Sequence, residues 1–355
     1  MAYTTIDDPS AHFQSAIYTG SSSSVTVTND GNSNLQPDFI WAKRRNGAND
    51  HDIFDTNRGV TKRMWSNQVS SENTGDGTGV TIHSDGFNTG TYWGDVNSNG
   101  NTFIGWQWKA NGGTTSSNTA GTITSTVQTN STSDFSIITY TGNGTDGANI
   151  GHGLSGAWDC VWMKNRGVTD DWQIYHKYQQ DFSQNTGGSF NDTGAFATCA
   201  NTSGRPTRTG ADRINLNDCG DLTSINGSSE NYLCYAFKEV QGYSKFGSYL
   251  GNGNADGPFV FTGFKPAWIL IKGVTGTRNW IIKDNKIDTS NTATQVIYVN
   301  LSNAENDAQN MDLLSNGFKH RSTEGDGNAD GVQYIYMAFA ESPFVSSEGI
   351  PTTAR

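Results

Sequence analysis

The chain of 355 residues lacks long hydrophobic runs. No segment approaches the ~20 consecutive apolar residues that a membrane-spanning helix needs. The opening MAYTTIDDPS has neither the basic start nor the apolar stretch of a secretory signal peptide. Charged residues make up only 16%, which is unlike the highly charged composition of disordered proteins. We therefore expect a folded protein that does not insert into a membrane.

Basic residues are fewer than acidic ones, 23 against 34, and the formal net charge is −11 at pH 7. Binding to nucleic-acid phosphates calls for a basic patch, so the charge argues against a nucleic-acid partner. One basic cluster stands out, formed by Lys43, Arg44 and Arg45. It is either a solvated strand end or a docking patch for an acidic partner, and we keep these three residues as candidate ligand contacts.

Cysteine is rare, and all four residues lie in the middle third of the chain. Neither a C-x-x-C motif nor a zinc-ligand spacing is present. Cys160 and Cys234 lie in apolar runs, so we predict buried free thiols there. Whether Cys199 and Cys219 form a disulfide stays open.

Turn-forming and aromatic residues are plentiful instead: Gly, Ser, Thr and Asn are common, and ten Trp are present. This mixture predicts an all-β protein with many short strands. The strands recur in three copies. Each copy opens with Tyr-x-Gly, at Tyr18, Tyr140 and Tyr249. An apolar strand ending in lysine follows (DFIWAK, DCVWMK and AWILIK, ending at Lys43, Lys164 and Lys272), and a second strand starts eight residues later, at His51, Trp172 and Trp280.

These copies predict three tandem β-sandwich, jelly-roll-like domains. The lysine-ending strands are apolar at successive positions, so a second sheet, a neighbouring repeat or another subunit must cover their other face. The predicted boundaries are an N-terminal arm at 1–12, repeat 1 at 13–110, a linker at 111–134, repeat 2 at 135–240, repeat 3 at 241–344 and a C-terminal tail at 345–355. The low-complexity linker predicts a flexible or extended connector. We expect repeats 2 and 3 to pack together and repeat 1 to be freer.

Motifs for catalysis are absent from the sequence: there is no Gly-x-Ser-x-Gly, His-Glu-x-x-His or P-loop. His152 and His176 have no counterparts in the other copies, and the acidic residues cluster in turns, where they cap their own backbone. The positions that the copies share are apolar strands, turns and the strand-end lysine. We therefore expect a protein that is not an enzyme.

One turn matches the start of a calcium loop, with Asp326, Asn328 and Asp330 as the candidate ligands. The alternative is a Gly-rich hairpin loop, and apart from this calcium site we expect no cofactor. The matched lysines are either repeated ligand contacts or strand-end side chains reaching for water. Trp172 and Trp280 are either sugar-stacking platforms or core residues. Trp93, in the turn-rich TYWGDVNSNG, is the better candidate for an exposed ligand contact.

Several segments resemble a repeated β-domain of virion proteins, tail-fibre-like or decoration-like, from tailed phages and especially marine and cyanobacterial ones. They are GTITSTVQTNSTSDFSIITYTGNGTDGANIGHGL, GYSKFGSYLGNGNADGPFVFTGFKPAWILIK, LLSNGFK and YIYMAFAESPF, and the likeness extends over nearly the whole chain. Repeat 2 departs most, with Gly156-Ala-Trp158 where a Pro is expected after the turn and an irregular region around Cys219. The family provides no catalytic residue to carry over.

The resemblance implies a structural component of a virion, assembled in the bacterial cytoplasm, with other virion proteins as partners and with a homo-oligomeric state. The leading hypothesis is a tail-fibre or receptor-binding appendage that contacts host-surface glycans. The alternative is a capsid decoration (cement) protein on the phage head. A third hypothesis, from another class, is a glycan-degrading enzyme.

Overall fold

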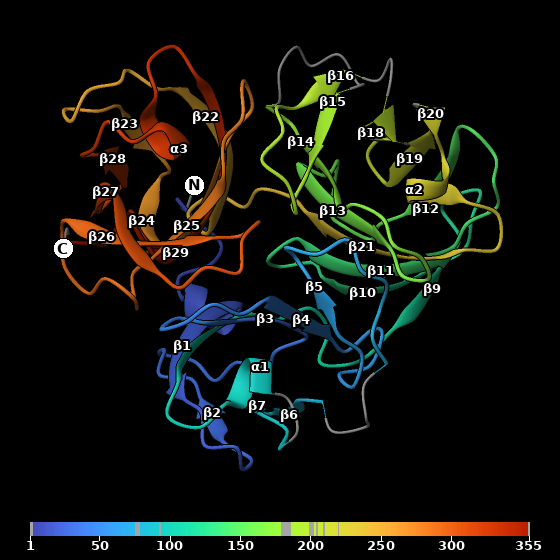
Figure 1. Ribbon diagram of the computed structural model, residues 1–355, viewed down its shortest axis with the longest axis horizontal. Helices are drawn as coiled ribbons and strands as arrows, with labels where there is room; N and C mark the ends of the chain where they lie inside the picture. Colours follow the sequence, from blue (N-terminus) through green and yellow to red (C-terminus); the bar gives the residue numbers. More distant parts are fainter. Residues whose placement is uncertain are drawn as a thin grey trace.

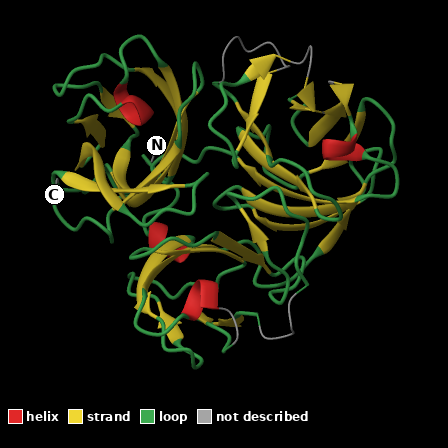
Figure 2. Ribbon diagram, in the orientation of Figure 1, coloured by secondary structure: helices red, strands yellow, loops and turns green. Residues whose placement is uncertain are grey.

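The computed structural model describes residues 3–74, 79–91, 94–178, 186–198, 202–203, 205–208, 210–218 and 220–353. The fold is all-β, as the composition predicts (Figure 2). Its helical elements are single turns: η1 (Pro9–Ala11), α1 (Gly94–Asn97), α2 (Thr223–Asn226) and α3 (Gly325–Asn328). Within these ranges, no helix has the length and apolar character that crossing a membrane takes.

Repeat 1 folds into two sheets. The larger has the order β1 (Phe13–Thr19), β8 (Thr102–Trp108), β3 (Phe39–Arg44), β4 (His51–Asp55), β5 (Met64–Trp65). The smaller has the order β2 (Thr26–Thr28), β7 (Gly86–Asn88), β6 (Thr81–His83). The chain alternates between the sheets from β1 to β3, and then β3, β4 and β5 follow one another in the larger sheet.

Repeat 2 has the same order in its larger sheet: β11 (Phe135–Thr141), β21 (Asn231–Phe237), β13 (Cys160–Asn165), β14 (Gln173–His176), β15 (Thr186–Ser189). The strand β16 (Ala197–Thr198) extends it at one edge. The smaller sheet is β12 (Ala148–Gly151), β19 (Arg213–Asn217), β18 (Arg205–Thr207), and a parallel pair joins β17 (Thr202–Ser203) to β20 (Gly220–Asp221).

Repeat 3 repeats the order once more: β22 (Ser244–Leu250), β29 (Gln333–Pro343), β24 (Phe264–Gly273), β25 (Trp280–Asp284), β26 (Ala293–Tyr298). Its sheet continues through β27 (Asn306–Leu314), β28 (Gly317–His320) and β23 (Phe259–Phe261), because β26 pairs with β27. The two sheets of this repeat are thus joined into one strongly curved sheet.

The Tyr-x-Gly mark of each repeat has a structural cause. In repeat 1 the Tyr18 ring stacks on Phe103 of the closing strand, with ring centroids 5.2 Å apart, and its hydroxyl donates to the Val96 carbonyl at 2.9 Å. A Cβ on Gly20 would lie 2.4 Å from the Ser98 carbonyl oxygen. Tyr140 with Gly142 and Tyr249 with Gly251 repeat this arrangement. The motif therefore anchors the one-turn helix of each repeat, and only glycine fits beside it.

Each repeat has a core of its own between its two sheets, and a fourth core is shared by all three. These two kinds of core explain why the lysine-ending strand is apolar at successive positions. In repeat 1, Ile40 and Ala42 belong to the repeat's own core, whereas Phe39 and Trp41 belong to the shared core. Two of the three coverings that the sequence left open, by a second sheet and by neighbouring repeats, are thus used.

The shared core is aromatic and lies where the larger sheets of the three repeats meet, at the centre of the molecule (Figure 1). Trp41 of repeat 1 lies with its ring centroid 5.8 Å from Trp162 of repeat 2 and 6.3 Å from Trp268 of repeat 3. The expectation that repeat 1 is freer was wrong, because its large aromatic side chains are buried against both other repeats.

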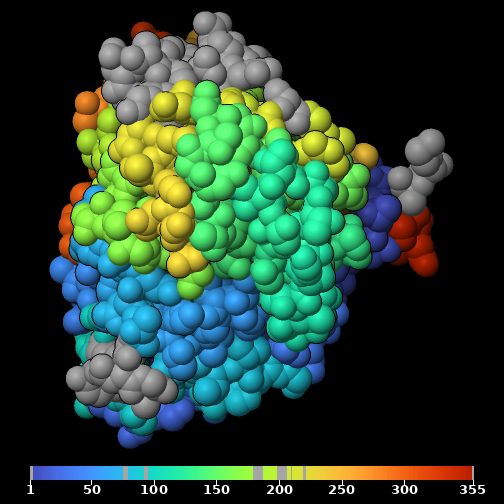
Figure 3. Space-filling view, turned by 90° about the vertical axis from the view of Figure 1, so that its right-hand side faces the viewer, coloured from blue at the N-terminus to red at the C-terminus, as the bar shows by residue number. Residues whose placement is uncertain are grey.

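The linker at 111–134 also differs from the expected connector. It contains β9 (Ser116–Asn118) and β10 (Ser125–Asn130), and β10 pairs with β11 and so extends the larger sheet of repeat 2. The space-filling view shows this teal to green segment lying along repeat 2 (Figure 3). Alternating burial of Ser125 and Val127 provides the strand pattern that the polar composition obscured.

The two terminal segments lie on repeat 3. The Tyr3 hydroxyl donates to the Gly263 carbonyl at 2.8 Å, and the Thr4 hydroxyl donates to the Gln241 carbonyl at 2.8 Å. The Ser347 N–H donates to the Asp7 carboxylate at 2.7 Å. The described parts of the arm and the tail are therefore packed together.

Candidate functional site

Three interfaces join the repeats into a ring. We call them the first seam (repeats 1 and 2), the second seam (repeats 2 and 3) and the third seam (repeats 3 and 1). Each is held by the same two main-chain hydrogen bonds between loops. The donor and acceptor pairs are Asp170 to Val69 (2.8 Å) and Glu72 to Arg166 (2.9 Å) in the first seam, Arg278 to Thr193 (2.9 Å) and Phe196 to Val274 (3.0 Å) in the second, and Asn49 to Ser302 (2.7 Å) and Glu305 to Arg45 (2.9 Å) in the third. The contacts are head-to-tail, and the third seam joins repeat 3 back to repeat 1, so the ring closes after three repeats.

The residue eight positions after each matched lysine lies at or directly before the start of the next strand, and it adds a third bond across its seam. Trp172 Nε1 donates to the Trp65 carbonyl at 2.7 Å, and Trp280 Nε1 donates to the Ser189 carbonyl at 2.9 Å. His51 Nε2 makes the matching 2.9 Å contact to the Tyr298 carbonyl. Trp172 and Trp280 are buried, so they serve as core residues rather than as sugar platforms.

The matched lysines are buried completely, although the sequence suggested that they reach water. Lys43 Nζ donates to the carbonyls of Arg44 (2.9 Å) and Ser302 (3.1 Å), the second of which lies across the third seam. Lys164 and Lys272 likewise donate to main-chain carbonyls. Burial lowers the pKa of each ammonium to about 8. These lysines therefore hold loops in place.

The basic cluster is divided between structure and surface. Arg45 makes two contacts to the Glu305 carboxylate, at 2.7 and 3.0 Å, so it locks the third seam. Arg166 and Glu72 form the matching bidentate pair in the first seam. Arg44 stays half-buried, with its Nε 3.3 Å from Asn46 Oδ1. Of the three basic candidates, only Arg44 is not committed to another repeat.

The other sequence candidates are placed as follows. Asp326 accepts the N–H and the side-chain amide of Asn279, at 2.7 and 2.9 Å. Asn328 is buried and binds the loop before β23, with its oxygen accepting the N–H of Asn252 at 2.9 Å. Asp330 lies beyond α3, near Gly253. No group of three or more His, Cys, Asp or Glu in the described ranges is arranged to hold a metal ion. Trp93, Cys199 and Cys219 lie outside the described residues.

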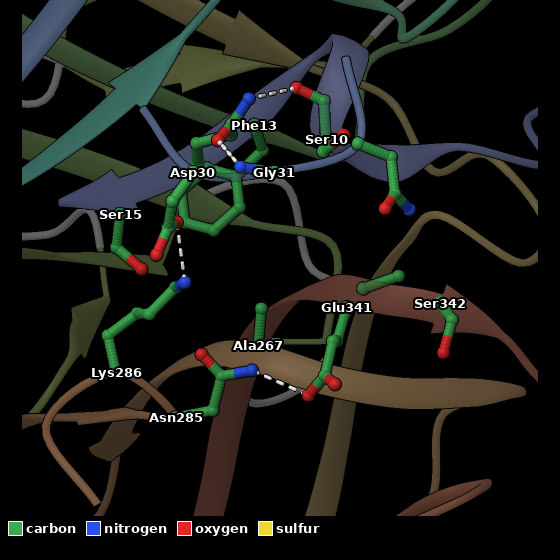
Figure 4. Close-up of a pocket in the computed structure, with 13 residues that line it drawn as sticks. Ser10, Phe13, Ser15, Asp30, Gly31, Ala267, Asn285, Lys286, Glu341 and Ser342 are labelled. Carbon is green, nitrogen blue, oxygen red and sulfur yellow. Dashed lines mark hydrogen bonds and ion pairs between the residues drawn. The ribbon is translucent and has the colours of Figure 1, made fainter. Parts of the chain in front are cut away.

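A cleft of about 350 Å³ opens in the third seam, between β1 and the loop before β3 on one side and the ends of β24, β25 and β29 on the other (Figure 4). Lys286 of repeat 3 meets Asp30 of repeat 1 across it at 2.6 Å. Glu341 accepts the side-chain amide of Asn285 at 2.6 Å and pairs with Lys265 at 2.9 Å. Hydroxyl, amide and carboxylate groups from two repeats therefore converge on one hollow.

The floor of the cleft is apolar. Phe13, Ala267 and Ala340 line it and are nearly buried. The Phe13 ring stacks on Phe339 at 5.2 Å and is thereby fixed in the shared core. The hollow thus combines a small apolar base with polar walls.

Ala267 explains why the hollow is here and not in the first seam. Its counterpart in repeat 1 is Asp38. Asp38 precedes Phe39, which pairs with Trp108 of the closing strand, and Ala267 precedes Trp268, which pairs with Phe339 of the closing strand. Asp38 accepts the N–H groups of Ala110, Gly112 and Gly113 at 2.7 to 2.8 Å, so the chain that leaves repeat 1 folds onto it. Gln128 of β10 donates to the same carboxylate at 2.9 Å.

The second seam is filled by a different set of groups. Asp159, the counterpart of Ala267 in repeat 2, accepts the N–H of Glu239 at 2.7 Å. The Glu239 carboxylate then pairs with Lys177 at 2.8 Å and with Lys245 at 2.6 Å. In repeat 3 the carboxylate is replaced by a methyl group, and the closing strand β29 continues past an irregular register at Pro266 to Pro343, which has no N–H to donate.

Repeat 3 also differs on its outer surface, where Phe259 and Phe261 are 45% and 53% exposed. They flank Val260 on β23, at the places where repeat 1 has Thr26 and Thr28 around Val27. Neither this pair nor the cleft was among the residues predicted from the sequence. Both are visible, however, when the repeats are aligned: DFIWAK and DCVWMK begin with Asp where AWILIK begins with Ala.

The family model described as "Domain of unknown function (DUF7483)" matches residues 8–343. No curated protein and no solved structure matches the chain. The matched range begins just before β1 and ends with β29, so it contains all three repeats and every seam between them. The chain belongs to the DUF7483 family.

Proposed function

We propose that this chain is a non-enzymatic structural protein of a tailed-phage virion, a tail-fibre or receptor-binding appendage that contacts host-surface glycans. The observation that carries the proposal is the ring of three sandwiches around one aromatic core. A block with threefold pseudo-symmetry fits a support that has a threefold axis, because each repeat then meets an equivalent environment. The resemblance of the segments quoted above to phage virion proteins points to the same setting.

The use of titratable side chains supports a structural role. The imidazoles of His51, His152, His176 and His320 are buried within the sandwiches or seams. His176 Nε2 lies 3.1 Å from the Tyr336 carbonyl across the second seam. Burial lowers the pKa of His176 to about 3, so this imidazole is neutral and unsuited to exchanging protons at neutral pH. The described carboxylates with the deepest burial likewise bind partners within the fold, as Asp55 does with Arg58 at 2.5 Å.

Immunogold electron microscopy of intact particles tests the proposal. Antibody against this chain is expected to label the tail. Label on the head would replace the appendage by a capsid decoration protein, and particles without label would overturn the virion assignment. Release of reducing sugar from host envelope polysaccharide by the purified chain would contradict the non-enzymatic role.

A further inference from the structure

We propose that the cleft of the third seam binds a short, uncharged saccharide, a mono- or disaccharide unit of a larger glycan. This inference rests on the proposed contact with host glycans and names where that contact is made. Ligand pockets usually measure roughly 300–1,000 Å³, so a cleft of about 350 Å³ suits a ligand of one or two sugar rings. It also lies between two repeats, where concave sites commonly form.

The charges around the cleft select an uncharged ligand. Lys286 is the cation that faces the hollow, and Asp30 neutralises it at 2.6 Å. Glu341 is paired with Lys265 at 2.9 Å. An anionic ligand would meet two carboxylates and one neutralised ammonium, and a cationic ligand would have to displace a lysine from each carboxylate. The cleft therefore favours neither an anionic nor a cationic ligand. An uncharged ligand neither meets the carboxylates as a like charge nor has to break their lysine pairs.

The lining also excludes a purely apolar ligand. Ser10 of the N-terminal arm and Ser15 of repeat 1 lie opposite Asn285 and Ser342 of repeat 3 (Figure 4). Gln14 and Asn32 also line the hollow, so hydroxyl and amide groups surround it. Sugar hydroxyls both donate and accept hydrogen bonds, and they match such a mixed set of partners. The C–H face of a sugar ring fits the small apolar floor of Phe13, Ala267 and Ala340.

The comparison with the other seams shows that this hollow is specific to the third one. The carboxylates of Asp38 and Asp159 draw the departing chain into the first and second seams. Ala267 has no carboxylate to draw the chain inward, and the closing strand β29, which pairs with β24, continues to Pro343. At this position of the third seam, space for a ligand thus takes the place that the departing chain fills at the matching positions of the other two seams.

The test uses the full chain and saturation-transfer NMR with glucose, galactose, mannose, rhamnose and N-acetylglucosamine, and glucuronate as the anionic probe. At least one neutral sugar is expected to receive saturation from the native chain, whereas glucuronate is not. Ala267→Asp places in repeat 3 the carboxylate that repeats 1 and 2 carry, and it is expected to weaken that binding at least tenfold. Ala255→Asp, the same change at an exposed loop of the same repeat, is the matched control and is expected to bind as the native chain does.

A second variant covers the case in which Ala267→Asp does not fold. Glu341→Gln keeps the shape of the side chain and removes a charged acceptor, so it is expected to weaken binding about tenfold. The inference is overturned if no neutral sugar binds at tens of millimolar, if glucuronate alone binds, or if the folded cleft variants bind like the native chain. If Ala267→Asp still attaches to host cells as the native chain does, the cleft is not the contact and the proposed attachment role stands on another surface.

Discussion

The first and third seams share one set of ring contacts but differ in the groups beside them. The first seam contains a buried ionic chain: the Tyr235 hydroxyl donates to Asp55 at 2.7 Å, Asp55 pairs with Arg58 at 2.5 Å, and Arg58 pairs with Glu72 at 2.9 Å. The third seam has an open cleft crossed by the exposed pair of Lys286 and Asp30. The difference shows that the ring contacts set the geometry, while the neighbouring residues decide whether a seam is a closed joint or a potential site.

The largest expected effect concerns Arg58 of the first seam. Its side chain is wholly buried, and Arg58→Ala would leave Asp55 and Glu72 without their shared cation. Removing one partner of a buried ion pair costs about 3–5 kcal/mol. We therefore expect a fall of that size in the free energy of unfolding, measured by urea denaturation. A loss below about 1 kcal/mol would show that the first seam is not held by its ionic chain.

The two seams are also expected to respond oppositely to pH. In the third seam, burial raises the pKa of Asp284 to about 6, although its carboxylate accepts Trp106 Nε1 at 3.0 Å. A folded-state pKa above the unfolded value of about 3.9 means that the folded protein binds the proton more tightly. Its contribution therefore becomes more favourable as pH falls from about 6 to 4, by up to about 3 kcal/mol.

In the first seam, burial opposes the charge of Glu72, but hydrogen bonds and charge from Arg166 and Arg58 outweigh it and lower the pKa of that carboxylate. The stability that it contributes is present above its unfolded pKa and is lost as pH falls through the folded one. Unfolding free energies measured from about pH 2 to 7 check both signs. Compared with the native chain, Asp284→Asn is expected to lack the rise in unfolding free energy as pH falls from about 6 to 4. Glu72→Gln is expected to show a smaller fall in unfolding free energy at acid pH than the native chain does. Parallel pH curves for all three proteins would contradict this assignment.

The pair across the cleft is expected to matter far less than its buried counterpart. Lys286 and Asp30 have side chains that are 39% and 69% exposed, and exposed ion pairs contribute about 0–1 kcal/mol. Lys286→Ala should thus change the unfolding free energy by less than about 1 kcal/mol. High salt should reduce even this difference. A loss comparable to that of Arg58→Ala would mean that the third seam depends on this bridge.

The smallest effect is expected on the outer surface of repeat 3. Replacing Phe259 and Phe261 by Thr, the residue at both matching places of repeat 1, removes exposed rings and leaves Val260 in the core. Surface changes of this kind usually stay within about 0.5 kcal/mol. Thermal unfolding of the double variant should match that of the native chain. A clear destabilisation would show that the rings cover a part of the fold.

The repeat pattern predicted the all-β fold and the matched strands because each unit carries its own short-range signals. Tyr18 with Gly20 anchors one turn, and the offset of eight residues from Lys43 to His51 spans one hairpin. The arrangement of the units could not be predicted, because an apolar face looks the same whether a sheet or a neighbouring repeat covers it. Repeat 1 was expected to be freer because a low-complexity linker follows it, although Trp41 lies in the shared core.

The candidate sites were predicted less well because charge and exposure were judged one residue at a time. Lys43 and Arg45 were candidates for a docking patch because they are basic neighbours in the sequence. Lys43 instead donates to the Ser302 carbonyl and Arg45 pairs with the Glu305 carboxylate, and both partners lie more than 250 positions away. The cleft depends on a missing carboxylate at Ala267, which becomes informative only when the three copies are compared position by position.

The covalent fusion of three like units has a consequence for how such a molecule can diverge. In a homotrimer of separate chains, any substitution appears at all three interfaces at once, and a change that hollowed one joint would weaken every joint. Here Ala267 occurs once while Asp38 and Asp159 keep their contacts. In a single chain of three repeats, two interfaces can therefore keep their stabilising contacts while the third changes into a binding site. A strictly symmetric homotrimer cannot change one interface alone.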